Sequence, residues 1–107
     1  MDGVKFQTKA GENGLITDLL IGGDLVIENS QYIKKELVGV GWRLSKTVKI
    51  TIAEVIDIDL SFIQLLMAFM RQLNELKIDY EIVWNLEDEQ KMILNNVGLN
   101  NEIFLNN

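Results

Sequence analysis

The clearest pattern in the chain is an alternation of apolar and polar positions that gives way to a helical repeat. Val48, Ile50 and Ile52 alternate with polar neighbours across residues 47–55. β-branched residues with a period of two predict a strand, and we expect both faces of this strand to be largely covered. Over residues 61–76 the apolar positions recur at helical spacing, which predicts an amphipathic helix packed on the sheet. Only a short joint separates the two elements.

Weaker patterns on either side complete the order of elements. Short alternating runs between turn residues predict strands, and apolar residues at helical spacing predict helices. In chain order these are a strand over residues 4–8, a turn at 11–14, a strand over 15–21 that ends in 22–24, a helix from 28 that stops in 38–41, a strand over 80–84 and a helix over 86–98. We expect the last helix to be capped by Asn85, to turn Met92, Ile93 and Val97 inward, and to end at Gly98.

The element order β-β-α-β-α-β-α predicts the fold class. Alternating strands and helices form a small mixed β-sheet covered by helices, so the chain is expected to be an α/β protein. The β-α-β crossovers should be right-handed. A length of 107 residues suits one domain, and we expect residues 1–107 to form a single domain without a linker.

Composition restricts the chemistry that this chain can perform. It contains no cysteine and no histidine, which excludes disulfides, thiolate nucleophiles, Ser-His-Asp triads and the usual zinc sites. The carboxylates at residues 87–89 are most simply a favourable charge set at a helix start, since they point in different directions around the helix. We therefore expect no enzyme activity, no metal and no cofactor.

Charge and hydropathy restrict the partners. The chain has 10 basic and 16 acidic residues and a net charge of −6, which argues against nucleic acid as a partner. The N-terminus lacks the pattern of a secretory signal, and the longest apolar stretch, residues 65–70, is too short to span a bilayer. We expect a cytoplasmic protein without direct membrane insertion.

Ser61 stands at the predicted start of the main helix and has two interpretations. With Gln64 three residues later it matches a capping box, in which the serine hydroxyl accepts from a backbone amide and the glutamine reaches back. A phosphate on the same hydroxyl would lie at the positive end of the helix dipole, among free amides. Asp59 could orient the hydroxyl or could itself cap the helix. The pattern leaves both roles open for each residue.

Two methionines on the main helix raise a similar question. Ile63, Met67 and Met70 fall on one flank of the apolar stripe. Methionine suits an adaptable partner surface, but it also fills seams between packed helices. Together with Phe62, which follows Ser61 directly, these three residues are the candidates for contact with a protein partner.

Four segments of the chain, in this order and spacing, resemble the STAS family, which comprises sulfate-transporter cytoplasmic domains and bacterial anti-sigma-factor antagonists. The resemblance covers residues 15–104. The matching segments are Gly23-Asp24-Leu25 before the first helix, residues 48–61 with Asp59 and Ser61 on the family's aspartate and second serine, the apolar Ile63, Leu65 and Leu66, and the closing Leu94-Asn95-Asn96-Val97-Gly98-Leu99 with Ile103-Phe104.

The resemblance implies a regulator of transcription that works by protein binding. In the family, an anti-sigma kinase phosphorylates the second serine; the unmodified form binds this kinase and the phosphorylated form releases it. Ser61 is then the phosphorylation candidate, and Asp59, Asp24 and Gly23 are its expected neighbours. The alternative is a constitutive STAS subunit of a transporter or signalling scaffold, in which Ser61 serves only as a helix cap.

The chain departs from the family pattern near this serine. Leu60 stands in place of the first serine and Phe62 in place of a glycine, while Val26 and Thr51 occupy positions that are often acidic. A glycine beside the acceptor serine would allow a kinase close to the backbone. We expect Phe62 to fill that space.

Overall fold

The structure is a computed structural model that describes residues 3–96. Its elements follow the predicted order β-β-α-β-α-β-α, with two short 3-10 helices added. They are β1 (Val4–Ala10), β2 (Ile16–Leu25), η1 (Ile27–Asn29), α1 (Ser30–Val40), η2 (Gly41–Arg43), β3 (Leu44–Ile58), α2 (Leu60–Glu75), β4 (Asp79–Trp84) and α3 (Asp88–Asn96). The predicted α/β class with a mixed sheet is confirmed.

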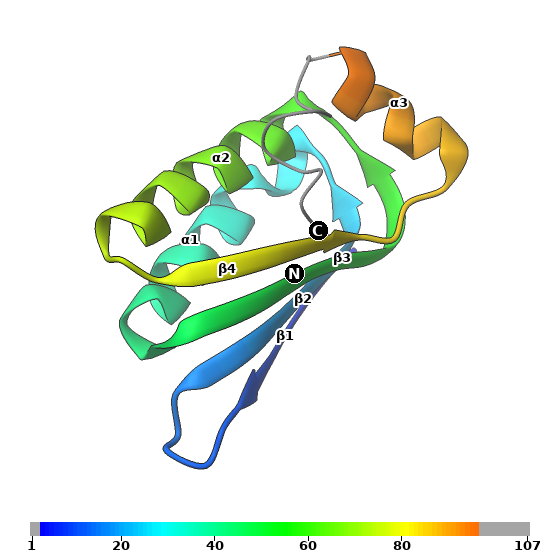
Figure 1. Cartoon of the computed structure of the whole chain (residues 1–107). Coiled ribbons are helices and arrows are strands. Elements are labelled where there is room, and N and C mark those ends of the chain that lie inside the picture. The colour runs from blue at the N-terminus through cyan, green and yellow to red at the C-terminus, as the bar shows by residue number, and fades with distance from the viewer. Residues whose placement is uncertain (1–2, 97–107) are drawn as a thin grey trace.

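The strands form one sheet in the order β1-β2-β3-β4. β1 and β2 are an antiparallel hairpin, whereas β2, β3 and β4 run parallel to one another. The crossovers through α1 and α2 lie on the same face of the sheet, and α3 lies beyond the end of β4 (Figure 1). Because the three parallel strands end at one edge, the segments that lead into α1, α2 and α3 all begin there.

The core lies between this sheet and the two crossover helices. The helix pattern of residues 61–76 is confirmed within one residue at each end, since α2 spans Leu60–Glu75. The buried residues of α2 are Phe62, Ile63, Leu66, Phe69, Met70 and Leu73. They pack in one cluster with buried side chains from all three parallel strands, including Ile21, Ile50 and Ile82. Burial of this amphipathic face, more than helix propensity, stabilises a helix of this length.

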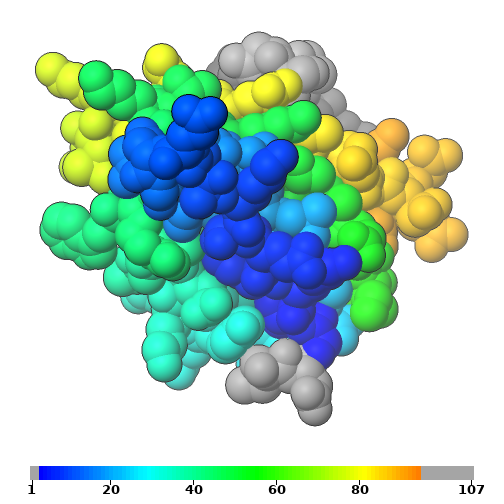
Figure 2. Space-filling model, turned by 90° about the horizontal axis from the view of Figure 1, so that it is seen from below, coloured from blue at the N-terminus to red at the C-terminus, as the bar shows by residue number. Residues whose placement is uncertain are grey.

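Among the described residues, no helix covers the opposite face of β3 (Figure 1). Val48, Ile50 and Ile52 point into the core, whereas Lys49 is exposed and Thr51 is only half-buried. Our expectation that both faces would be largely covered is therefore wrong. The reason is topological, since both crossovers place their helices on one face. Figure 2, a view from below, shows the β1–β2 hairpin (blue) lying in front of the molecule.

β2 does not break at its glycines, as the sequence suggested, but continues through Gly22 and Gly23 to Leu25. From Ile21 to Leu25 β2 advances four residues while its partner β3 advances six, from Ile52 to Ile58, so β3 bulges. The bulge places Glu54 at φ 55°. It also brings the Ala53 carbonyl oxygen to 2.0 Å from where a Cβ on Gly22 would lie. Glycine is needed here because β3 approaches so closely, and not because the strand ends.

The last helix begins later than predicted. The Asn85 amide donates to the Ile52 carbonyl at 2.8 Å and Asn85 precedes α3, so it is not the cap of this helix. Instead, Gln90 in the first turn reaches back, and its Oε1 accepts from the amide of Glu87, the residue before the helix, at 3.0 Å. Met92 is exposed, so the prediction that it turns inward is wrong, whereas Ile93 is half-buried. The expectations for Val97, Gly98 and Ile103-Phe104 lie outside the described residues.

Candidate functional site at the carboxyl ends of the strands

Asp59 forms the joint between β3 and α2. Its backbone is extended, with φ −135° and ψ −179°, and it is the N-cap of α2. Its amide donates to the Leu25 carbonyl at 3.1 Å, which ties the joint to the end of β2. Its carboxylate accepts from the Ser61 amide at 2.9 Å. An aspartate is well suited here because it satisfies a free amide and places negative charge at the positive end of the helix.

Ser61 is the second residue of α2 and not its cap. The capping box with Gln64 is therefore wrong, and the alternative that Asp59 caps the helix is confirmed. The half-buried Ser61 donates its hydroxyl hydrogen to Asp59 Oδ1. Asp59 thus also orients the hydroxyl, as the other alternative supposed. A single carboxylate oxygen holds both the amide and the hydroxyl of the candidate phosphorylation residue.

The second oxygen of Asp59 bonds a different element. Asp59 Oδ2 accepts from the Ile27 amide at 3.0 Å, at the first residue of η1. Partial burial raises the pKa of Asp59, but the Ser61 hydroxyl and the amides of Ile27, Ser61 and Phe62 outweigh it, so the pKa lies below its ordinary value of 3.8. The carboxylate is therefore ionised at neutral pH.

Gly23 and Asp24 lie one strand away from Ser61, on β2. Gly23 has φ 87° and approaches the Gly3 carbonyl so closely that a Cβ would lie 2.0 Å from its oxygen. Asp24 Oδ2 is directed toward Gly3, and the Asp24 carbonyl accepts from Asn29 Nδ2 at 2.9 Å. Both residues pair with β3; Gly23 also pairs with β1, and Asp24 contacts Gly3 and η1. They shape the same edge of the sheet as Asp59.

The structure corrects two of the partner-binding candidates. Phe62 and Ile63 are fully buried and belong to the core, so they cannot form a contact surface. Since the Phe62 side chain points inward, it does not fill the space outside Ser61, and that expectation is wrong as well. Within the described residues, the exposed apolar side chains at this edge include Leu60, with 44% of its surface accessible, and Ile27, with 64%. Sequence reasoning missed both, because it sought contact candidates only on the main helix after Ser61.

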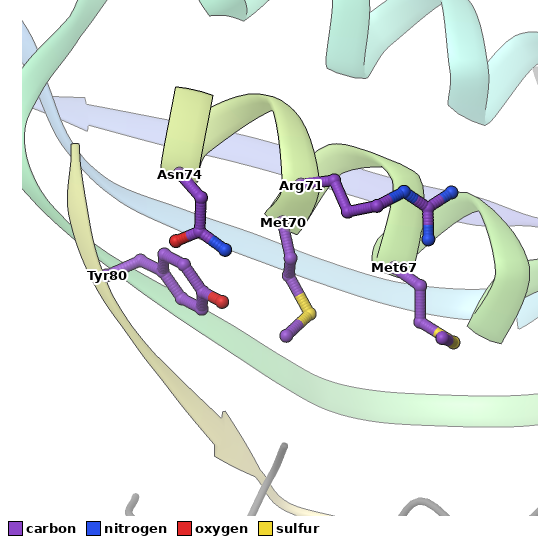
Figure 3. A pocket seen from close by; sticks show the side chains of 5 residues that line it. All are labelled: Met67, Met70, Arg71, Asn74 and Tyr80. Carbon is purple, nitrogen blue, oxygen red and sulfur yellow. The ribbon is translucent and has the colours of Figure 1, made fainter. Parts of the chain in front are cut away.

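The two methionines line a groove on the far half of α2. The groove has a volume of about 280 Å³, and its residues are Met67, Met70, Arg71, Asn74 and Tyr80. Tyr80 reaches from β4 toward α2, and Met67 and Met70 lie along the helix beside it (Figure 3). Met70 is buried and Met67 half-buried. Met70 therefore fills the seam between helix and sheet, and Met67 remains a candidate for partner contact.

Among the described residues we find neither a metal site nor a membrane-spanning helix. Within residues 3–96, no three side chains of histidine, cysteine, aspartate or glutamate come together where they could hold a metal ion. None of the helices in the same part of the chain combines the length and hydropathy that crossing a bilayer requires.

Comparison with solved structures identifies the fold. The chain is similar to an anti-sigma factor antagonist from Mycobacterium paratuberculosis, with a TM-score of 0.75 and 12% identity over 92% of this chain and 81% of that one. It is also similar to the anti-sigma factor antagonist SpoIIAA in its unphosphorylated form, with a TM-score of 0.65 and 17% identity over 89% and 82% of the two chains. The third similar structure is the Bacillus cell fate determinant SpoIIAA in its phosphorylated form. Its TM-score is 0.60, with 16% identity over 89% of this chain and 85% of that one.

These likenesses establish the fold that the four sequence segments suggested. The chain has the fold of anti-sigma-factor antagonists, and the expected STAS-type architecture is confirmed. No family model matches the sequence, and no curated protein matches it either. With identities between 12% and 17%, the structural likeness concerns the fold and does not transfer a function.

Proposed function

We propose that the protein is a non-catalytic regulator of the anti-sigma-factor-antagonist type, switched by phosphorylation of Ser61. The observation that carries the proposal is the position of Ser61: its hydroxyl lies in the first turn of α2, held by Asp59 and not covered by Phe62. The similar structures include one such antagonist in both unphosphorylated and phosphorylated forms. A site of this kind accepts a phosphate without loss of the fold, since the helix amides stabilise it.

The partner in this proposal is a protein, in the simplest case an anti-sigma kinase in the bacterial cytoplasm, where ATP is present. In the transfer, Ser61 Oγ forms a bond to the γ-phosphorus of ATP, ADP leaves, and the hydroxyl proton passes to a base of the kinase. The exposed Ile27 and Leu60 border the acceptor and supply apolar contact area. The net charge of −6 favours a partner with a basic surface over a nucleic acid.

The alternative, a constitutive subunit of a transporter or scaffold, assigned Ser61 only a capping role. The capping role belongs to Asp59, and in this alternative the Ser61 hydroxyl would serve only to hold the Asp59 cap through its hydrogen bond. Constitutive binding without phosphorylation is therefore one outcome of the test below.

The test compares charge variants of Ser61 in binding to the partner recovered from the native host. A phosphate adds between about one and two negative charges next to Asp59, and a docked partner would have to desolvate them. We expect Ser61→Asp to fold normally and lose the partner, while Ser61→Ala still binds. Ser45→Asp, at the start of β3 and the opposite end of the sheet, is the matched charge control and should bind.

Mass spectrometry of the protein from its host completes the experiment. Phosphate mapped to Ser61, together with a kinase among the bound proteins, supports the proposal. If both Ser61 variants bind as the wild type does and the host protein carries no phosphate, the constitutive-subunit function is the better account.

A further inference from the structure

The Asp59 carboxylate joins two elements that are far apart in the sequence. Oδ1 accepts from the amide and the hydroxyl of Ser61, in the first turn of α2. Oδ2 accepts from the amide of Ile27, which begins the η1 turn that leads into α1. One side chain therefore hydrogen-bonds both the Ser61 hydroxyl and the first amide of the η1 turn.

We propose that Asp59 is a positioning residue that transmits the modification state of Ser61 to the η1 turn. While the hydroxyl is free, Asp59 holds the Ile27 amide; a phosphate on Ser61 displaces the carboxylate and releases that amide. The inference rests on the proposed function only in taking Ser61 as the modified residue.

The reason is a change of hydrogen-bonding character at Ser61 Oγ. A serine hydroxyl can donate one hydrogen, and here it donates to Asp59 Oδ1. Once Oγ is a phosphate ester it has no hydrogen, so the oxygen becomes an acceptor facing an acceptor. The phosphate also brings between about one and two negative charges to within bonding distance of a carboxylate. The attraction at this point becomes a repulsion.

The two anions also compete for the same donors. The Ser61 and Phe62 amides at the start of α2 interact with the Asp59 carboxylate. Phosphate is a strong acceptor for such amides and can replace the carboxylate as their partner. In the unmodified protein the Asp59 carboxylate is ionised at neutral pH, so an incoming phosphate meets a charged group. Rotation of its side chain away from Ser61 withdraws Oδ2 from Ile27.

The consequence reaches the surface of the molecule. Ile27 is exposed and stands next to the start of α1, which lies beside α2 on the sheet. A partner that contacts η1 would therefore meet a changed backbone as well as a changed charge. Modification of one residue would therefore change a larger part of the surface that a partner contacts.

The experiment measures amide hydrogen exchange by NMR on the full chain with phosphoserine incorporated at position 61 during synthesis. Loss of a charge-assisted hydrogen bond should raise the exchange rate of the Ile27 amide about tenfold to a hundredfold. The Asp59 amide, which donates to the Leu25 carbonyl, is the internal reference and should change little. In Ser61→Ala the Asp59–Ile27 bond remains, so Ile27 should exchange as in the wild type.

A double-mutant comparison separates coupling from simple loss of stability. In Asp59→Asn the amide oxygen is a weaker acceptor, so Ile27 should already exchange faster, and phosphoserine should then add little. An equal phosphoserine effect with and without Asp59 would overturn the proposal, as would equal acceleration of the Ile27 and Asp59 amides. Since no kinase is used, an unchanged Ile27 rate refutes the coupling and leaves the Ser61 switch standing. Absence of phosphate in the host protein refutes the switch and leaves the coupling measurable.

Discussion

Leu73→Ala tests the packing of α2 on the sheet. Leu73 is fully buried, with 0% of its surface accessible, in the stripe that faces the strands. The change removes roughly three methylene-sized groups at about 0.8 kcal/mol each, which gives about 2.4 kcal/mol from transfer alone. The cavity left behind raises the expected loss to about 2–5 kcal/mol, depending on how far the neighbours relax. Against a total of about 5–15 kcal/mol for a domain, this is a large fraction.

The matched control is Leu76→Ala, the same chemical change at the end of the same helix. Leu76 has 52% of its surface accessible, so little apolar burial is lost and the effect should stay within about 0.5 kcal/mol. Urea unfolding followed by circular dichroism gives both free energies, provided that the m-value is unchanged. If Leu73→Ala and Leu76→Ala destabilise equally, the assignment of Leu73 to the core is refuted.

Two further predictions concern the backbone and the site. Gly22→Ala should destabilise by about 1–3 kcal/mol, because the added Cβ meets the Ala53 carbonyl. The control is Gly39→Ala in α1, where an added Cβ meets nothing within 4 Å, and it should stabilise the protein by about 0.5–1 kcal/mol. If the two variants change the stability equally in thermal unfolding, the close approach of β3 at its bulge is contradicted. Since folding lowers the pKa of Asp59, its contribution to stability is fully present above the unfolded value of 3.8 and is lost as the pH falls below that value through the lower pKa of the folded state. The stability difference between the wild type and Asp59→Asn should thus shrink below about pH 4 in urea titrations, and a constant difference would argue against the pKa shift.

The element order could be predicted because each element carries its own periodicity. Val48, Ile50 and Ile52 showed a strand, and the spacing of residues 61–76 showed a helix, with no knowledge of their partners. What the sequence could not decide was the side on which the crossovers lie. Small or amphipathic residues such as Thr51 fit an open face as well as a covered one, so the strand pattern did not distinguish the two.

The site was predicted in part, for a similar reason. Asp59 and Ser61 are both good helix caps, and local sequence does not choose between them. The choice depends on a tertiary contact, the bond from the Asp59 amide to the Leu25 carbonyl at the end of β2. A cap moved by two residues also changes which residues open the first turn. Phe62, directly after the supposed cap, was included among the contact candidates although its spacing also fits the apolar stripe of the helix, and the exposed Leu60 was not.

The two tryptophans give the molecule optical reporters of different kinds. Trp42, in η2 at the amino ends of the parallel strands, has 92% of its surface accessible, so its emission should hardly change on unfolding. Trp84 is half-buried and pairs with Ile52 near the carboxyl end of β4, the end that carries Ser61. Trp42→Phe would leave Trp84 as the single indole, so that fluorescence would report on the carboxyl edge of the sheet without an attached dye.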